Sequence, residues 1–243
     1  MNHYAERYGT TFTTSEGSYH SFRDFGLYPH QHPDIPPAKI KRRYVDIPAA
    51  DGGIDLSELP QGFTVFENRT GTFPFVVVER NRFDSALTAI TAALHGKMAY
   101  IIKDEEPSFR YHGRVSVNGL DCDSLRGIIT VEADLEPFKY ELKSTAEDWL
   151  WDPFNFETGV IREYGNIAVN GTKAVTVISS PAGGVPTITA SAAMTVTYNG
   201  ETYNLASGSN VIDDIYLPRG VESVTLTFNG TGTVGIDFLP GYL

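Results

Sequence analysis

The chain has 243 residues, 41% of them hydrophobic, so it is long and apolar enough to bury one large core or two smaller ones. Its 23 glycines and 14 prolines indicate many turns, which favours a mainly β fold over a helical bundle. The formal net charge of −11 argues against binding to DNA or RNA, because such binding needs a clustered basic surface.

The first 38 residues are expected to form an extended arm with short strands. Four prolines in this stretch disfavour both a helix and a central strand: Pro29, Pro33, Pro36 and Pro37. Polar and apolar residues partly alternate over residues 40–47, which predicts a strand that Pro48 ends, and Asp51-Gly52-Gly53 then predicts a turn. We expect this stretch to pair with the sheet edge of a second copy of the chain through Pro36, Lys39, Lys41, Arg43 and Tyr44.

A sheet with one helix is expected in the rest of the first domain, which is predicted to span residues 1–145. The predicted strands are residues 63–66, 73–79, 98–102, 109–117, 128–134 and 138–142. Pro74 should place its strand at a sheet edge or stand at the strand's beginning. A helix is predicted over residues 84–95, with Asp84 as its N-cap, Gly96 as its left-handed stop, and a buried face made of Leu87, Ile90 and Leu94.

The composition changes after residue 145. Residues 146–165 are predicted to be an aromatic linker, whose cluster at residues 149–156 docks between two domains or, alternatively, stacks on sugars. Residues 166–243 contain only seven charged residues and several short alternating strands, with a strong hairpin signal at Asn199-Gly200. Gly230, Gly232 and Gly235 are interpreted as residues in and after a hairpin turn. This pattern predicts a C-terminal β-sandwich.

The sequence lacks the motifs of common enzymes. There is no Gly-x-Ser-x-Gly elbow, no phosphate-binding loop and no dinucleotide fingerprint, so we expect no catalysis and no cofactor. The one metal-binding hypothesis combines His30, His32 and Asp34, because imidazoles two residues apart on an extended chain point the same way.

The single cysteine, Cys122, rules out an intramolecular disulfide and suits assembly in a reducing cytoplasm. The first residues lack the apolar core of a signal peptide, and no run of 18 apolar residues exists. We therefore expect a protein that is neither secreted by the usual route nor anchored in a membrane.

The order of several short segments resembles the distal tail proteins of siphophages, which are ring subunits at the tip of long non-contractile tails. Tyr19-His20-Ser21-Phe22-Arg23-Asp24-Phe25-Gly26-Leu27 is similar to the opening signature of that family. Val45-Asp46-Ile47-Pro48 and Asp51-Gly52-Gly53-Ile54-Asp55-Leu56 resemble a later stretch, with Ala49 in place of the family's usual glycine. Residues 129–140 and 217–238 are similar to the ends of the family's first and second domains.

This resemblance implies an N-terminal β-barrel-like domain with one helix and a C-terminal β-sandwich of galectin-like type. It also implies a non-enzymatic structural subunit of the tail tip or baseplate, whose hexameric ring joins the tail tube protein to the tip hub protein. The tape measure protein and receptor-binding proteins are further possible partners. The expected location is the virion, after assembly in the cytoplasm of the host bacterium. The alternative function is a carbohydrate-binding β-sandwich protein for adsorption to the host surface.

Overall fold

The structure is a computed structural model that describes residues 8–49, 51–59, 62–122, 126–147, 160–220 and 222–243. The chain forms two compact units, Met1–Lys139 and Tyr140–Leu243, each with its own hydrophobic core. The predicted aromatic cluster at residues 149–156 lies outside the described residues. Among the described residues, no helix has the length and apolarity needed to cross a membrane.

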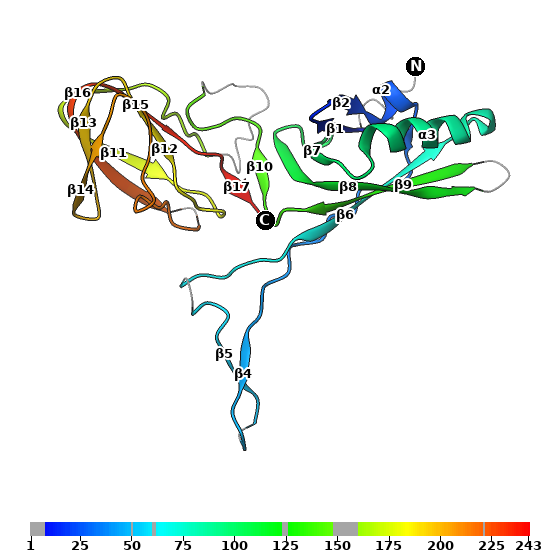
Figure 1. Cartoon of the computed structure of the whole chain (residues 1–243), viewed down its shortest axis with the longest axis horizontal. Helices are drawn as coiled ribbons and strands as arrows, with labels where there is room; N and C mark the ends of the chain where they lie inside the picture. The colour runs from blue at the N-terminus through cyan, green and yellow to red at the C-terminus, as the bar shows by residue number, and fades with distance from the viewer. Residues whose placement is uncertain (1–7, 50, 60–61, 123–125, 148–159, 221) are drawn as a thin grey trace. The chain divides into compact units, whose positions relative to one another are not determined.

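The first unit is built on an antiparallel sheet (Figure 1). Its strands pair in the order β2-β1-β7-β8-β9-β6-β3. They are β1 (Thr10–Thr14), β2 (Gly17–His20), β3 (Tyr28–Pro29), β6 (Arg69–Val77), β7 (Met98–Lys103), β8 (Phe109–Cys122) and β9 (Gly127–Leu135). Alternate residues of β6 and β9 are buried, so one face of the sheet covers the core and the other faces outward.

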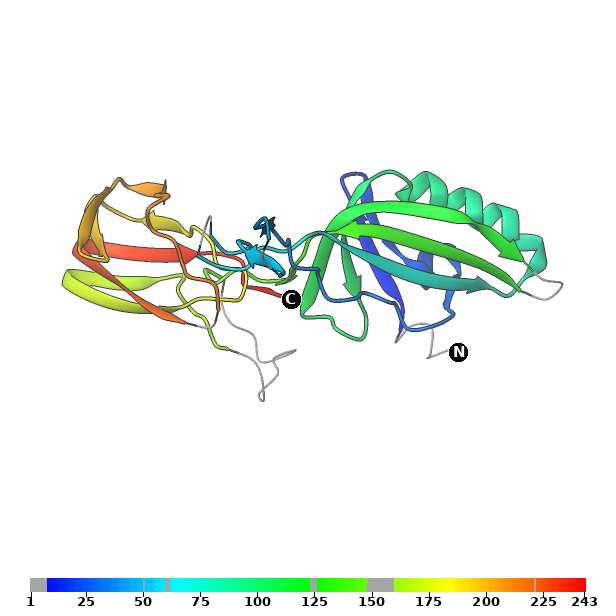
Figure 2. The ribbon, with the colours of Figure 1, turned by 90° about the horizontal axis from the view of Figure 1, so that it is seen from below.

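Helix α3 (Phe83–Leu94) follows the 3-10 turn η1 (Arg80–Arg82) and packs on this core, as Figure 2 shows along one face of the sheet. The predicted helix is confirmed, and Gly96 follows it at a φ of 77°. One detail of the prediction was wrong: Asp84 lies inside the first turn, and the N-cap is Arg82, which makes no capping hydrogen bond. Leu87, Ile90 and Leu94 pack on the core as predicted, Ile90 and Leu94 fully buried and Leu87 partly buried.

A short helix, α2 (Ser21–Phe25), interrupts the stretch that was predicted to be extended. Its cap is the side chain of His20, whose Nδ1 accepts hydrogen bonds from the backbone N–H groups of Phe22 and Arg23, each at 3.2 Å. Gly26 ends it at a φ of 66°. A helix of one turn with a histidine cap has none of the usual Ser, Thr, Asp or Asn start signals, which explains why the sequence pattern missed it.

Pro74 lies in the middle of β6, not at its beginning. Its carbonyl accepts a hydrogen bond from the backbone N–H of His30, beside the two-residue strand β3. The backbone N and O of one strand residue point to the same side, so the missing N–H of Pro74 also faces this short edge strand. The hydrogen bonds between β6 and β9 therefore lose no donor at Pro74. The proline is tolerated in β6, the strand next to the edge strand β3.

The second unit is a six-stranded antiparallel sheet around a second core. Its strands are β11 (Ile167–Ile178), β12 (Thr187–Ala190), β13 (Met194–Tyr198), β14 (Glu201–Leu205), β15 (Gly208–Val211) and β16 (Ser223–Asp237). Asn199 and Gly200, both with positive φ, join β13 to β14 as predicted. In addition, β10 (Lys139–Glu141) lies beside β17 (Gly241–Tyr242), where the N–H of Glu141 donates to the carbonyl of Pro240.

The hairpin turn predicted around Gly230 does not exist, because β16 runs unbroken through it. One edge of β16 pairs with β11, and the other edge pairs with β13 and then β12. A Cβ atom on Gly230 would lie 2.5 Å from Cβ of Met194, and one on Gly232 would lie 2.5 Å from Oγ of Ser191. These glycines therefore allow close approach of neighbouring chain segments. The fold class predicted from the sequence, mainly β with one helix in the first domain, is confirmed, and the one-turn helix α2 is an addition to it.

Candidate assembly surface

The described residues from Lys39 to Glu67 in the first unit include paired extended segments, and we call this part of the chain the arm. At its base, the N–H of Lys41 donates to the carbonyl of Val65, and the N–H of Glu67 donates to the carbonyl of Lys39. Farther along, β4 (Tyr44–Asp46) pairs with β5 (Gly53–Asp55), and the two strands are seen side by side in Figure 1. The predicted strand and the predicted glycine turn are thus two parts of one hairpin.

The arm exposes an unusual share of the chain's large apolar side chains. Among the described residues, fourteen such side chains are exposed, and six of them belong to the arm: Ile40, Tyr44, Val45, Ile47, Ile54 and Leu59. Val45 and Ile54 stand directly opposite each other on the two strands, with exposed fractions of 44% and 50%. Clustered apolar side chains on a strand pair without a core are typical of a surface that contacts another chain.

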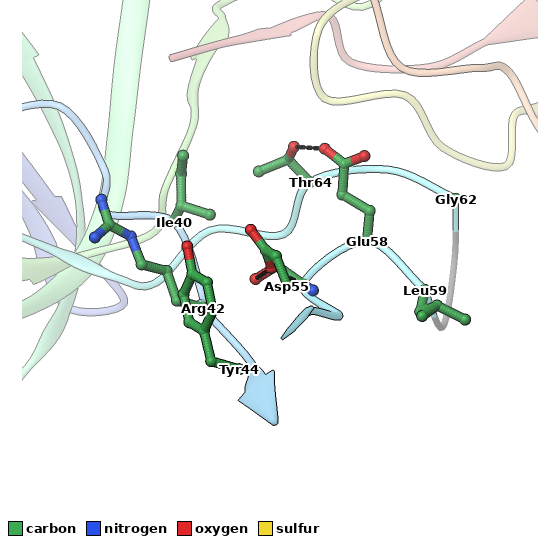
Figure 3. Close-up of a pocket in the computed structure, with 9 residues that line it drawn as sticks. Ile40, Arg42, Tyr44, Asp55, Glu58, Leu59, Gly62 and Thr64 are labelled. Carbon is green, nitrogen blue, oxygen red and sulfur yellow. Dashed lines mark hydrogen bonds between the residues drawn. The ribbon is translucent and has the colours of Figure 1, made fainter. Parts of the chain in front are cut away.

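One side of the arm is hollowed (Figure 3). The hollow has a volume of about 770 Å³ and is lined by Ile40, Arg42, Tyr44, Asp55, Ser57, Glu58, Leu59, Gly62 and Thr64. Its polar groups are ordered by local hydrogen bonds. Ser57 donates to Asp55 Oδ1 through both its N–H and its hydroxyl, at 2.9 and 2.5 Å, which lowers the pKa of the Asp55 carboxyl. Thr64 donates to Glu58 Oε1 at 2.7 Å.

The structure places all five residues predicted for self-association on or beside the arm, and all five are exposed: Pro36, Lys39, Lys41, Arg43 and Tyr44. Only Tyr44 of these lines the hollow. Sequence reasoning missed Arg42 and the whole second strand of the arm. Residues 63–66 were predicted as a strand, but they form no regular strand, and Phe66 makes an isolated bridge to Ile40 within the arm. The signal was available, because alternating residues on both sides of Asp51-Gly52-Gly53 form a hairpin pattern.

The residues of the metal hypothesis are engaged separately. Nε2 of His32 lies 2.8 Å from Oε2 of Glu105, and its Nδ1 lies 2.8 Å from the carbonyl of Pro33. His30 and Asp34 both use their backbone groups to pair with β6. Within the described ranges, no three histidine, cysteine or acidic side chains are grouped so that they could hold a metal ion.

A second surface is the outer face of the second unit's sheet. Two rows of side chains cross four strands in register: Asn204–Thr195–Asn229–Thr172 and Thr202–Thr197–Thr227–Ala174. Each of these residues is exposed or half-buried, and none is charged. The hydroxyls of Thr197 and Thr202 lie 3.0 Å apart. Apart from Ala174, the face therefore offers a regular array of uncharged hydrogen-bonding side chains, spaced about 4.8 Å from strand to strand.

A deeply buried ion pair of the second unit has a structural role. Arg162 is 5% exposed and donates to the carbonyls of Ile178 and Ser179 at 2.9 and 2.8 Å. Its Nη1 also lies 3.3 Å from Oε1 of Glu141, which accepts a hydrogen bond from the Tyr242 hydroxyl at 2.8 Å. Burial raises the pKa of the Glu141 carboxyl. These contacts hold strand ends together, and the Glu141 carboxylate is occupied by Arg162 and Tyr242.

Comparison with known proteins gives one informative result. No protein-family model and no curated protein sequence matches the chain. Among solved structures, it is similar to SPP1 Dit (gp 19.1), described as a paradigm of the hub adsorption apparatus in phages that infect Gram-positive hosts. The TM-score is 0.60 at 15% sequence identity, over 96% of this chain and 99% of that one. The chain has the Dit fold. The resemblance to distal tail proteins that the sequence shows is thereby confirmed at the level of the fold.

Proposed function

We propose that this chain is a structural, non-enzymatic component of a bacteriophage tail tip. One observation carries the proposal: the Dit fold extends over 96% of this chain and accounts for 99% of the SPP1 protein. The similarity to the SPP1 protein therefore includes both units of this chain and is not limited to one widespread type of domain. The independent similarity of segment order, from residues 19–27 to residues 217–238, supports the same conclusion.

We infer that the chain assembles into a closed hexameric ring through the arm. The exposed apolar side chains of the arm, including Val45 and Ile54, supply area that contact with a neighbouring copy would remove from water. A closed ring covers every such arm, since each copy both gives and receives the same contact. The ring would join the tail tube protein to the tip hub protein, with the tape measure protein or receptor-binding proteins as additional partners, in the virion after assembly in the host cytoplasm.

Negative-stain images and mass photometry of the purified full chain test this proposal. The expected result is a ring with a central hole and the mass of six copies, formed either by the chain alone or after addition of tail tube or hub protein. A chain that stays monomeric at high concentration, also with both partners present, contradicts the proposal.

The second candidate function is carbohydrate binding by the second unit, and the uncharged Thr and Asn rows favour it. Sugars are recognised through hydrogen bonds to hydroxyl and amide groups, and a face without charge suits a neutral glycan. A glycan array probed with the full chain tests this function. Thr227→Lys places a charge in the centre of the face and is expected to abolish binding, whereas Val211→Lys, on β15 outside the two rows, is expected to leave it unchanged.

A further inference from the structure

An excess of positive charge is concentrated at one end of the first unit's core. Arg69 begins β6, Lys103 ends β7 and Lys139 begins β10, and the carboxylate of Glu106 lies among them. Three cations and one anion leave a net charge of two. All these groups belong to the first unit, and none belongs to the arm or to the outer Thr and Asn face.

Both carboxylate oxygens of Glu106 already interact with the two lysines and with Tyr111. Its Oε1 forms an ion pair with Lys139, and its Oε2 lies 3.3 Å from Nζ of Lys103 and accepts a hydrogen bond from the Tyr111 hydroxyl at 3.4 Å. The aromatic rings below add attraction for the cations. Nζ of Lys103 lies 5.7 Å from the Tyr111 ring centre, and Nζ of Lys139 lies 4.7 Å from that of Phe109.

Arg69 is buried beside the Tyr111 ring. It is 7% exposed, on the same side of β6 as the core residues Phe73 and Phe75. Its guanidinium carbon lies 5.3 Å from the Tyr111 ring centre, but its buried Nε and Nη2 atoms have no hydrogen-bond partner within the part of the chain that the structure describes. Buried guanidinium groups in folded proteins are almost always hydrogen-bonded, because an unmet donor in a dry interior is costly.

We propose that Arg69, Lys103 and Lys139 form a binding site for an oxyanion of the phosphate or carboxylate type. Water would satisfy the N–H groups of Arg69 but would not offset the repulsion among three cations, whereas an anion does both. A guanidinium presents parallel N–H groups that match the oxygens of a phosphate or carboxylate, and the two ammonium groups add point charges beside it. The site does not depend on the tail-tip function proposed above.

The test is a titration of the purified full chain, in Tris chloride at constant ionic strength, with inorganic phosphate and separately with acetate. Isothermal titration calorimetry should show saturable binding at one site, and the melting temperature of the first unit should rise with ligand concentration. Binding of phosphate alone identifies a free phosphate-type ligand. Equal binding of acetate identifies the carboxylate class, which a side chain of another chain also supplies.

Arg69→Met and Lys103→Met should each weaken binding by about tenfold or more, because each removes a charge-assisted contact to the anion. Lys173→Met, an exposed lysine of the second unit, is the matched control and should bind as the unaltered chain does. If Arg69→Met does not fold, Lys103→Met decides the matter. The absence of saturable binding of both anions, or equal affinities in the control and the cluster variants, would overturn the proposal.

Discussion

Placing lysine at Val45 and Ile54 tests whether the arm holds copies of the chain together. These two side chains face each other across the arm and contact no core. Full burial of such a side chain stabilises by about 1.5–3 kcal/mol, and each is about half exposed, so covering the exposed half contributes roughly 1 kcal/mol. The double variant should therefore weaken each contact between copies by ~2 kcal/mol, or about 30-fold in the association constant. Burying two ammonium groups would add to this loss.

The assay combines mass photometry over a dilution series with a thermal melt. The double variant should shift from rings to monomers at concentrations where the unaltered chain is assembled, while its monomer stability changes by less than about 0.5 kcal/mol, as for other surface substitutions. Val211→Lys is the matched control, because Val211 is 64% exposed and lies on β15 of the second unit. If the double variant assembles as readily as the control, the arm does not carry the contact.

Three further predictions concern the first unit. Ile90→Ala should lower the free energy of unfolding by about 2–5 kcal/mol in a chemical denaturation experiment, because Ile90 is fully buried. Leu87→Ala should lower it clearly less, because Leu87 is only partly buried, and equal losses would contradict the buried face of α3. Gly113→Ala should prevent stable folding, since a Cβ there would lie 2.1 Å from the carbonyl oxygen of Asp134, whereas Gly119→Ala meets nothing within 4 Å and should be tolerated. Burial raises the pKa of Tyr111 from 10.0 to about 12, so the folded state holds the hydroxyl proton more tightly than the unfolded state does. This difference contributes roughly 3 kcal/mol to the free energy of unfolding. The contribution is complete below pH 10 and is lost as the pH rises through 12. Stability measured against pH for Tyr111→Phe should lack this part of the alkaline decline, and an unchanged profile would assign the decline to other groups.

The sequence predicts the fold well wherever a segment packs on its own unit's core. The strand periodicity of β7 and β9 and the helical periodicity of α3 place these elements within one or two residues, because burial of one face produces the pattern directly. Asn199-Gly200 identifies its hairpin for an equally local reason, since both residues adopt positive φ in the turn.

The errors occur where a residue's meaning depends on a partner distant in the sequence. Gly230 and Gly232 have the composition of a turn, but their role is to let Met194 and Ser191 approach a continuous strand. Pro74 is acceptable inside β6 because the strand on its N–H side is only two residues long. Neither neighbour is visible in the local sequence, so the usual meaning of glycine and proline misleads in both places.

The arm was predicted least completely, and the physical reason bears on its role. Its strands alternate around a glycine turn, which indicates a hairpin, yet neither face covers a core of this chain, so the alternation does not indicate what the arm packs against. A two-stranded ribbon held by backbone hydrogen bonds and a pair such as Val45 and Ile54 is only marginally stable in water. Contact with another chain would cover these apolar side chains and supply the burial that the arm lacks on its own. The exposure that makes the arm hard to interpret as part of one domain is therefore the property expected of a segment whose packing partner is a second molecule.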